Sequence, residues 1–340
     1  MKKKVLICDR QADFVSLLQR NLSGMLSRAG IDVYAYDDVE KLLESPEVRE
    51  SSLTLIGESL LSAFDTEKLL SLTKKVVYLT EERRGEGIFK YQSAGALQKQ
   101  ILRLLLEDED FSEFAGPAGG EHRAKIIAFY SPVRPLLQSS LALTLGQILA
   151  KEHKSLYLNF EPYSGMEYLM QREFSKGLTE LLFYIKNEDS RLAWRLESLA
   201  EKVGELSFIP PVFAYPDLEE VQPEGFWKLI SRIARETEYE YLLLDLSELN
   251  GIFTILENCD MIFCPYVGDP LAMAKVDRYE KMLEFLEYNR IFEKTNRLAL
   301  PGFSRLPEGV TALCHSQMAD YIKEKILPLI LQEGCGVSNG

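Results

Sequence analysis

The stretch that most constrains the fold of this chain runs from Lys125 to Ala150. It contains the unbroken apolar run IIAFYSP, the short loop VRPLLQSS and the segment LALTLGQILA. An apolar run rich in Ile and aromatic residues predicts a parallel strand buried on both faces, and Leu and Ala at helical spacing predict a helix. A strand, a tight loop and a helix form the frame in which nucleotide-binding proteins hold a phosphate.

The loop in this frame lacks the residues that bind phosphate. Such a loop needs glycines that let consecutive backbone N–H groups turn inward, a Lys for the β and γ phosphates, and a Ser or Thr for magnesium. The loop here contains no Gly, Pro135 has no N–H to donate, and Gln138 stands where a Lys is needed. Only Ser139 and Ser140 keep the required hydroxyl groups. We interpret the stretch as a nucleotide-binding frame that has lost its phosphate site.

From about Ala124 to its end, the chain resembles the deviant P-loop ATPases, the group that includes MinD, ParA and CpaE. The loop of that group is K-G-G-x-G-K-[ST]-[ST], between a strand and a helix much like those above. On that pattern the signature lysine becomes Val133, the two glycines Arg134 and Pro135, the third glycine Leu137, and the phosphate lysine Gln138. The resemblance therefore implies the fold of these ATPases without most of their phosphate-binding motif.

Two further strands extend this resemblance. The next strand of the family ends in D-x-D-P, and SLYLNFEP places Asn159 and Glu161 at the two acidic positions. YEYLLLDLS matches the strand on the magnesium side of the family's site and keeps Asp245. In an active relative this carboxylate would hold magnesium, but carboxylates at strand ends also cap neighbouring helices. The missing Lys and glycines favour the capping role here.

Strands and helices also alternate over the first part of the chain, residues 1–106. KVLICD, DVYAY, SLTLIG, KKVVYLT and GIFKY have the composition of strands, and stretches of helical periodicity separate them. This alternation predicts a doubly wound parallel sheet. Ligands of such sheets bind at the carboxyl ends of the strands, so the residues at those ends are the candidate site.

Those strand ends resemble the response-regulator receiver domains. The family has an acidic pair after the first strand, a phosphorylated Asp after the third, Thr or Ser after the fourth and Lys after the fifth. This chain keeps Asp9, Thr80 and Lys90, has Arg10 as the second member of the acidic pair, and has Gly57 at the phosphoacceptor position. The nucleophile is therefore missing, which argues against phosphorylation. We expect Asp9 and Lys90 to form a simple ion pair with a structural role.

Residues 107–123 separate the two parts. Their acidic residues followed by Gly, Ala and Pro predict an exposed linker. The predicted architecture is therefore α/β, with two doubly wound parallel-sheet domains: a receiver-like domain of the flavodoxin or CheY type at 1–106, and a domain of the MinD and ParA type at 124–340.

Composition narrows the class of partner and the compartment. A net charge of −13 argues against a nucleic-acid-binding face, because phosphate contacts need clustered Lys and Arg. Five scattered cysteines without metal spacing suit a reducing compartment. The apolar run at the start is interrupted at Asp9 and Arg10, so no signal peptide is expected, and no uncharged run approaches the ~20 residues of a membrane span. We expect a cytoplasmic protein.

Two segments of the second part are candidate contact surfaces. The helical tail at 316–331 is partly amphipathic, but Lys323 and Lys325 are its only basic residues, so packing onto the domain is favoured over membrane contact. In the resembling ATPases a partner-contacting segment lies near LSFIPPVFAYPDLEEV, which makes Phe213 and Tyr215 candidate interface residues. Burial of these two aromatics in a loop-covered core remains an equal alternative.

Two hypotheses follow. The first is a non-catalytic pseudo-ATPase scaffold that needs no cofactor and binds protein partners, in a pilus or secretion machine as the CpaE domain order suggests. The second is an ATP-binding switch that grips the phosphates through Arg134 and holds magnesium through Ser139 and Asp245. Family ATPases commonly dimerise around nucleotide, so the loss of nucleotide binding argues against that dimer. A third, weaker hypothesis is a homodimer formed through the receiver-like domain. The three histidines lie in no catalytic or metal-binding pattern.

Overall fold

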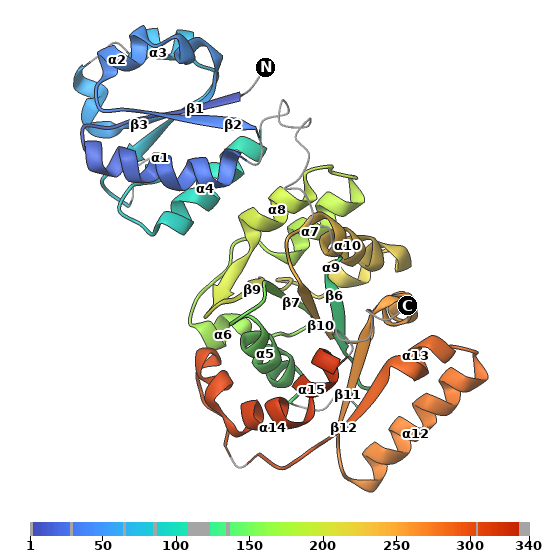
Figure 1. Cartoon of the computed structure of the whole chain (residues 1–340). Helices are drawn as coiled ribbons and strands as arrows, with labels where there is room; N and C mark the ends of the chain where they lie inside the picture. Colours follow the sequence, from blue (N-terminus) through green and yellow to red (C-terminus); the bar gives the residue numbers. More distant parts are fainter. Residues whose placement is uncertain are drawn as a thin grey trace, which may run out of the picture. The chain divides into compact units, whose positions relative to one another are not determined.

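The computed structural model of the chain describes residues 3–27, 30–63, 66–83, 87–107, 123–133, 137–303 and 305–332. The chain divides into two compact units. The first comprises Met1–Ala118 and Ala193–Ser198, and the second comprises Gly119–Leu192 and Leu199–Gly340. Most of the predicted linker, 108–122, lies outside the described residues. Figure 1 shows residues up to 107 of the first unit in blue and teal, its segment Ala193–Ser198 in yellow-green, and the second unit from green to red.

The first unit contains a parallel sheet in the order β2-β1-β3-β4-β5. Its strands are β1 (Lys3–Cys8), β2 (Ile31–Tyr36), β3 (Ser51–Gly57), β4 (Val76–Thr80) and β5 (Ile88–Phe89). This is the strand order of flavodoxin-like doubly wound sheets. The five strands predicted from the sequence, and their parallel arrangement, are confirmed.

Helices cover both faces of this sheet because alternate residues of its strands are apolar on both sides. Val5 and Ile7 of β1 face a core that also contains Leu22 of α1 and Ile101 of α4, whereas the intervening Leu6 packs with the other core. The helices of the unit are α1 (Ala12–Leu26), α2 (Val39–Glu44), α3 (Thr66–Leu72) and α4 (Ala94–Leu106).

A segment distant in sequence completes the first unit. Trp194, in helix α8 (Leu192–Leu199), is fully buried in the core that α1 and α4 cover. The helical pattern of residues 191–203 predicts that Trp194 is a core residue, which is confirmed. The same pattern falls within the predicted domain at 124–340, because periodicity alone does not show which sheet a helix covers.

The second unit contains a sheet in the order β12-β11-β6-β10-β7-β9-β8. Its strands are β6 (Lys125–Phe129), β7 (Ser155–Phe160), β8 (Glu201–Val203), β9 (Leu206–Ile209), β10 (Tyr241–Leu246), β11 (Met261–Val267) and β12 (Thr295–Leu300). Every pairing is parallel except that of β8 with β9. The predicted parallel sheet therefore needs one correction, which is an antiparallel strand at its edge.

Two local predictions at this edge of the sheet, for residues 191–203 and for the segment from Leu206, also need correction. The apolar spacing of residues 191–203 predicts one helix, but helix α8 ends at Leu199 and Glu201–Val203 form β8. Pro210, Pro211 and Pro216 predict that the segment LSFIPPVFAYPDLEEV is limited to edge or loop structure, but its strand β9 pairs on both sides. It does so because all three prolines follow its last residue and leave its N–H groups free to pair.

The helices of the second unit pack on its sheet and on one another. They are α5 (Gln138–Leu149), α6 (Met166–Met170), α7 (Leu178–Lys186), α9 (Pro216–Glu219), α10 (Pro223–Glu236), α11 (Ile252–Asn258), α12 (Pro270–Phe285), α13 (Asn289–Lys294), α14 (Gln317–Lys325) and α15 (Leu327–Gln332). Helix α5 lies against the sheet, and α14 packs on α5 (Figure 1). This layer fixes the position of the residues at the start of α5.

The predicted packing of the carboxyl-terminal tail onto the domain is confirmed. Met318, Ile322 and Ile326 are completely buried in the core that contains α5. The tail breaks between α14 and α15 at Ile326, two residues before Pro328, because proline removes a donor and crowds the preceding turn. Among the described residues, no helix has the length and apolar character needed to cross a bilayer.

Candidate functional site

The carboxyl edge of the second sheet gathers the residues that the phosphate-loop frame predicted. Strand β10 lies between β6 and β7, and Asp245 is in register with Phe129 on one side and Asn159 on the other. Helix α5 begins at Gln138, inside the segment predicted to be loop. Arg134 and Pro135 lie outside the described residues.

A hydrogen-bonded network surrounds the carboxylate of Asp245, which is completely buried. The side-chain amide of Gln138 donates to Asp245 Oδ1 at 2.9 Å and to the carbonyl oxygen of Leu246 at 2.9 Å. The hydroxyl of Tyr157 donates to Asp245 Oδ2 at 2.7 Å, and the amide of Asn159 donates to the same oxygen at 3.2 Å. Both oxygens of the carboxylate therefore already have donors from within the chain.

These donors are neutral, which sets the electrostatics of the network. Burial raises the pKa of Asp245, and the hydrogen bonds from Gln138 and Tyr157 act in the opposite direction. Burial also raises the pKa of Tyr157 well above its ordinary value, and the nearby charge of Asp245 adds to this effect, so the hydroxyl keeps its proton and donates. The network satisfies a buried acid without a cation.

The other predicted residues of this edge bind one another. Ser139 Oγ donates to Glu161 Oε2 at 2.9 Å, and the backbone N–H of Glu161 donates to Asn159 Oδ1 at 2.9 Å. The carbonyl oxygen of Ser140 accepts a 2.6 Å hydrogen bond from Thr144. The serine that resembles the magnesium ligand of the family is thus occupied by a glutamate of the same chain.

Two further loop residues, Val133 and Leu137, contact other residues of the chain. The N–H of Val133 donates to Ser131 Oγ at 3.4 Å, and Leu137, which precedes α5, packs against the core of the unit. Helix α5 has no side-chain cap. The predicted capping role of Asp245 is therefore wrong in detail, because its carboxylate binds the side chain of Gln138 rather than backbone N–H groups at the helix start.

These residues do not fit magnesium and a nucleotide phosphate. Magnesium prefers several oxygen ligands, and phosphate loops supply a lysine and inward-facing N–H groups. Here the carboxylates of Asp245 and Glu161 already accept hydrogen bonds from side chains of the same chain, and the position of the lysine carries an amide that already donates twice. No group of three or more His, Cys, Asp or Glu side chains in the described part of the chain is placed to hold a metal ion.

The strand ends of the first unit contain a second closed site. Lys90 and Asp9 are both buried, and Lys90 Nζ lies 3.2 Å from Asp9 Oδ2 and 2.7 Å from Glu81 Oε1. The N–H of Gln11 donates to Asp9 Oδ1 at 3.0 Å. The ion pair expected between Asp9 and Lys90 is present, and Glu81 joins it from the rim.

Gly57 is what allows Asp9 to occupy this position. A Cβ atom at residue 57 would lie 2.3 Å from Asp9 Oδ2, so the carboxylate fills the space that a phosphoacceptor side chain needs. Thr80 does not join the pair, because its hydroxyl donates to the carbonyl oxygen of Glu82 at 3.0 Å. The site therefore holds an internal salt bridge where the resemblance placed a phosphorylation site.

Gly57→Ala is expected to lower the free energy of unfolding by about 2 kcal/mol, since the added methyl group displaces the Asp9 carboxylate from Lys90. Gly95→Ala is the matched control, because a Cβ atom at that helical position meets open space. Urea denaturation of both variants measures the difference. Equal stability of the two variants would contradict the packing described here.

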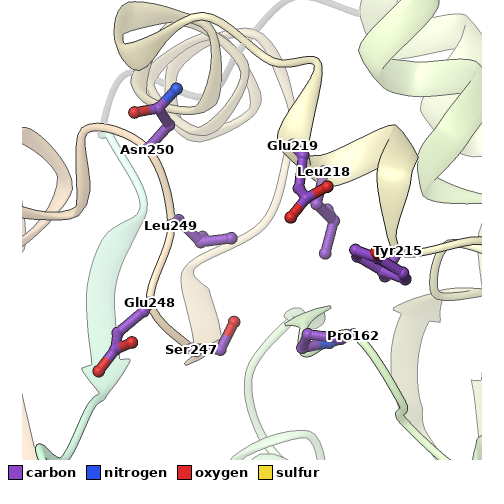
Figure 2. A pocket seen from close by; sticks show the side chains of 8 residues that line it. All are labelled: Pro162, Tyr215, Leu218, Glu219, Ser247, Glu248, Leu249 and Asn250. Carbon is purple, nitrogen blue, oxygen red and sulfur yellow. The ribbon is translucent and has the colours of Figure 1, made fainter.

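A cavity of about 310 Å³ lies beside the Asp245 network, at the carboxyl ends of β7 and β10. We call it the edge pocket, and its walls include Pro162, Tyr215, Leu218, Glu219, Ser247 and Leu249. Figure 2 shows the carboxylate of Glu219 directed into the space between Tyr215 and Leu249. The hydroxyl of Ser247 donates to the carbonyl oxygen of Phe160 at 2.8 Å, which ties β10 to β7 at the floor of the pocket.

Sequence reasoning missed two parts of this edge. Tyr157 precedes Asn159 by two residues in a strand, so both side chains lie on the same face, and this spacing could have identified the tyrosine. The edge pocket had no sequence signal, because its residues come from loops that only the fold brings together.

Comparison with known proteins gave matches among solved structures alone. No protein-family model matches the chain, and no curated protein matches it. A ParA family ATPase from Chlorobium tepidum is 16% identical over 57% of this chain and 81% of its own, with a TM-score of 0.46. A plasmid partition protein from Borrelia burgdorferi is 17% identical over 60% of this chain and 87% of its own, with a TM-score of 0.42.

The MinC:MinD cell division complex from Aquifex aeolicus is a third similar structure. It is 15% identical over 51% of this chain and 67% of the matched chain, with a TM-score of 0.40. The structures to which this α/β chain is similar are thus MinD- and ParA-type P-loop ATPases, at low sequence identity.

Proposed function

We propose that this protein is a non-catalytic pseudo-ATPase scaffold. The observation that carries the proposal is the double hydrogen bond of Gln138, which donates to Asp245 and to the Leu246 carbonyl where an active relative would place a lysine and its nucleotide. A buried network whose polar groups are all satisfied is rigid and specific, so the start of α5 has a fixed shape without ligand.

The first unit supports the same proposal. We propose that it is a receiver-like domain in which the Asp9–Lys90 ion pair replaces magnesium and the phosphorylated aspartate. A buried pair with both members present holds its strand ends in one arrangement. Neither unit then changes its conformation through the chemistry of its family, and the protein acts by binding other proteins.

The process is proposed from domain order. A receiver-like domain followed by a MinD- and ParA-type domain resembles CpaE, which suggests a cytoplasmic role in the assembly or positioning of a pilus or secretion machine. Protein partners are expected, and a homodimer is one form the scaffold can take. The acidic net charge of −13 speaks against nucleic acid as a partner.

Isothermal titration of the full chain with Mg-ATP tests the proposal. The scaffold is expected to give no heat of binding at micromolar concentrations. Binding at these concentrations that is lost in Arg134→Ala would support the alternative, an ATP-binding switch that uses Arg134, Ser139 and Asp245. ADP and AMP in the same titration separate phosphate recognition from simple adenine binding.

A further inference from the structure

Three exposed aromatic side chains, which we call the aromatic cluster, lie on the loops beside the edge pocket: Tyr215 lines it, Tyr163 pairs with Tyr215, and Phe213 precedes Tyr215 by two residues. Phe213 is 92% exposed, Tyr163 is 84% exposed and Tyr215 is 42% exposed. The rings of Tyr163 and Tyr215 are 6.3 Å apart, within the range of aromatic pairs. They follow β7 and β9, two neighbouring parallel strands, and so lie at one edge of the sheet.

This aromatic cluster is costly to expose and does not contribute to the core of its unit. Exposed aromatic side chains grouped beside a concave surface mark sites of contact with other proteins. The cluster also extends beyond the pocket, because Phe213 and Tyr163 do not line it. A small molecule seated in the pocket would leave both of these rings in water, whereas a polypeptide segment would cover them.

The charge of the pocket selects the partner. The described residues that line it include two glutamates, Glu219 and Glu248, and no cation. Figure 2 shows the carboxylate of Glu219 directed into the pocket and that of Glu248 directed away from it, with Leu218 between Glu219 and Tyr215. An acid and an aromatic ring that line one pocket suit a planar cation, because a guanidinium group stacks on a ring and pairs with a carboxylate through two N–H groups.

We propose that the edge pocket binds an arginine side chain of a partner protein, with Tyr163 and Phe213 covering apolar residues that flank this arginine. The inference rests on the proposed scaffold function, for which it names the chemistry of the partner. At this pocket a partner with a basic segment is favoured over a second copy of this chain, because the net charge of −13 makes the approach of a second copy to an acidic pocket less favourable. Lysine fits less well, since its ammonium group does not stack in a plane.

A synthetic peptide with one arginine flanked by leucines tests the proposal on the full chain. Its twin carries citrulline, which has the same shape without the charge. Surface plasmon resonance is expected to show the arginine peptide binding at least about fivefold more tightly than the citrulline peptide, the effect of one partly exposed charge pair. Equal binding of the two peptides would overturn the proposal.

Three variants test whether the preference for the arginine peptide arises at the edge pocket. Glu219→Gln is expected to abolish the preference for arginine over citrulline, and Glu284→Gln, which removes an exposed carboxylate on α12, is expected to leave it unchanged. Phe213→Ala is expected to weaken the binding of both peptides and to leave the binding of free arginine amide unchanged. Loss of preference in Glu284→Gln, or binding of arginine amide as tight as that of the peptide, would contradict a protein partner at this pocket.

The peptide-binding measurement also distinguishes failure of this inference from failure of the proposed function. Each peptide measurement is repeated with saturating Mg-ATP. If ATP binds and the peptide preference persists, the scaffold proposal fails while the arginine site stands. If ATP does not bind and the two peptides bind alike, the arginine site fails while the scaffold proposal stands.

Discussion

Lys90→Met is expected to lower the free energy of unfolding of the first unit by about 3 kcal/mol or more, because it leaves the completely buried carboxylate of Asp9 without its cation. The loss arises from an uncompensated charge rather than from lost packing. Asp9→Asn combined with Lys90→Met should therefore be less destabilising than Lys90→Met alone. Additive effects of the two substitutions would contradict a coupled pair.

The pH dependence of this unit provides a second measure of the same pair. Burial lowers the pKa of Lys90, but hydrogen bonds to Glu81 and Asp9 outweigh it and raise the pKa above the ordinary value of 10.5. A raised lysine pKa contributes stability that is fully present below pH 10.5 and is lost as the pH rises through the folded-state pKa. Lys90→Met should lack this alkaline loss.

Tryptophan fluorescence restricts the measurement of unfolding to the first unit. Trp194 is buried in the core of the first unit, so urea denaturation in a Trp227→Phe background reports on that unit. Lys41→Met is the matched control, because Lys41 pairs with Asp37 at 2.9 Å on the surface, with both side chains at least half exposed. Loss of an exposed pair is expected to cost at most about 0.5 kcal/mol.

Asp245→Ala is expected to destabilise the second unit by about 3 kcal/mol, because it leaves the donors of Gln138, Tyr157 and Asn159 unsatisfied in a buried site. Native-state hydrogen exchange of the β10 amides measures the loss. Glu219→Ala, at the exposed edge pocket, is the control and should change stability by less than about 0.5 kcal/mol. An unchanged exchange rate in Asp245→Ala would show that the network is not structural.

Many of the strands and helices could be predicted from the sequence because they depend on hydrophobic periodicity. The buried strand β6 reads as an apolar run, and the helical spacing after it predicts α5. The Asp9–Lys90 pair could also be predicted, since the carboxyl ends of all the strands of a parallel sheet lie at one edge and the receiver-domain resemblance places both residues there. These features depend on periodicity and on topology, both of which are local in the sequence or fixed by fold class.

Short elements and side-chain partners could not be predicted in this way. Strands β8 and β9 have three and four residues, too few to show a period, and the turn between them depends on Gly204, which has a φ of +59°. The amphipathic pattern of residues 276–288 predicts a helix from Val276, but α12 starts at Pro270, where the Asp269 side chain accepts hydrogen bonds from the first turn. An Asp followed by a Pro is a sequence signal for a helix start and identifies this position.

The absence of a phosphate lysine at Gln138 is visible in the sequence, but what the glutamine does instead is not. Its partner, Asp245, lies 107 residues away, and the third member, Tyr157, comes from a strand between them. Only the register of β7, β10 and the start of α5 brings these groups within hydrogen-bonding distance. The closed network is a property of tertiary structure.

A crystal structure of the protein soaked with Mg-AMPPNP would test the closure of this site most directly. The account predicts that Gln138 keeps its hydrogen bonds to Asp245 and to the Leu246 carbonyl, with no triphosphate or metal at the start of α5. A triphosphate seated against Gln138 and Ser139, with magnesium on Asp245 and the glutamine displaced, would contradict it.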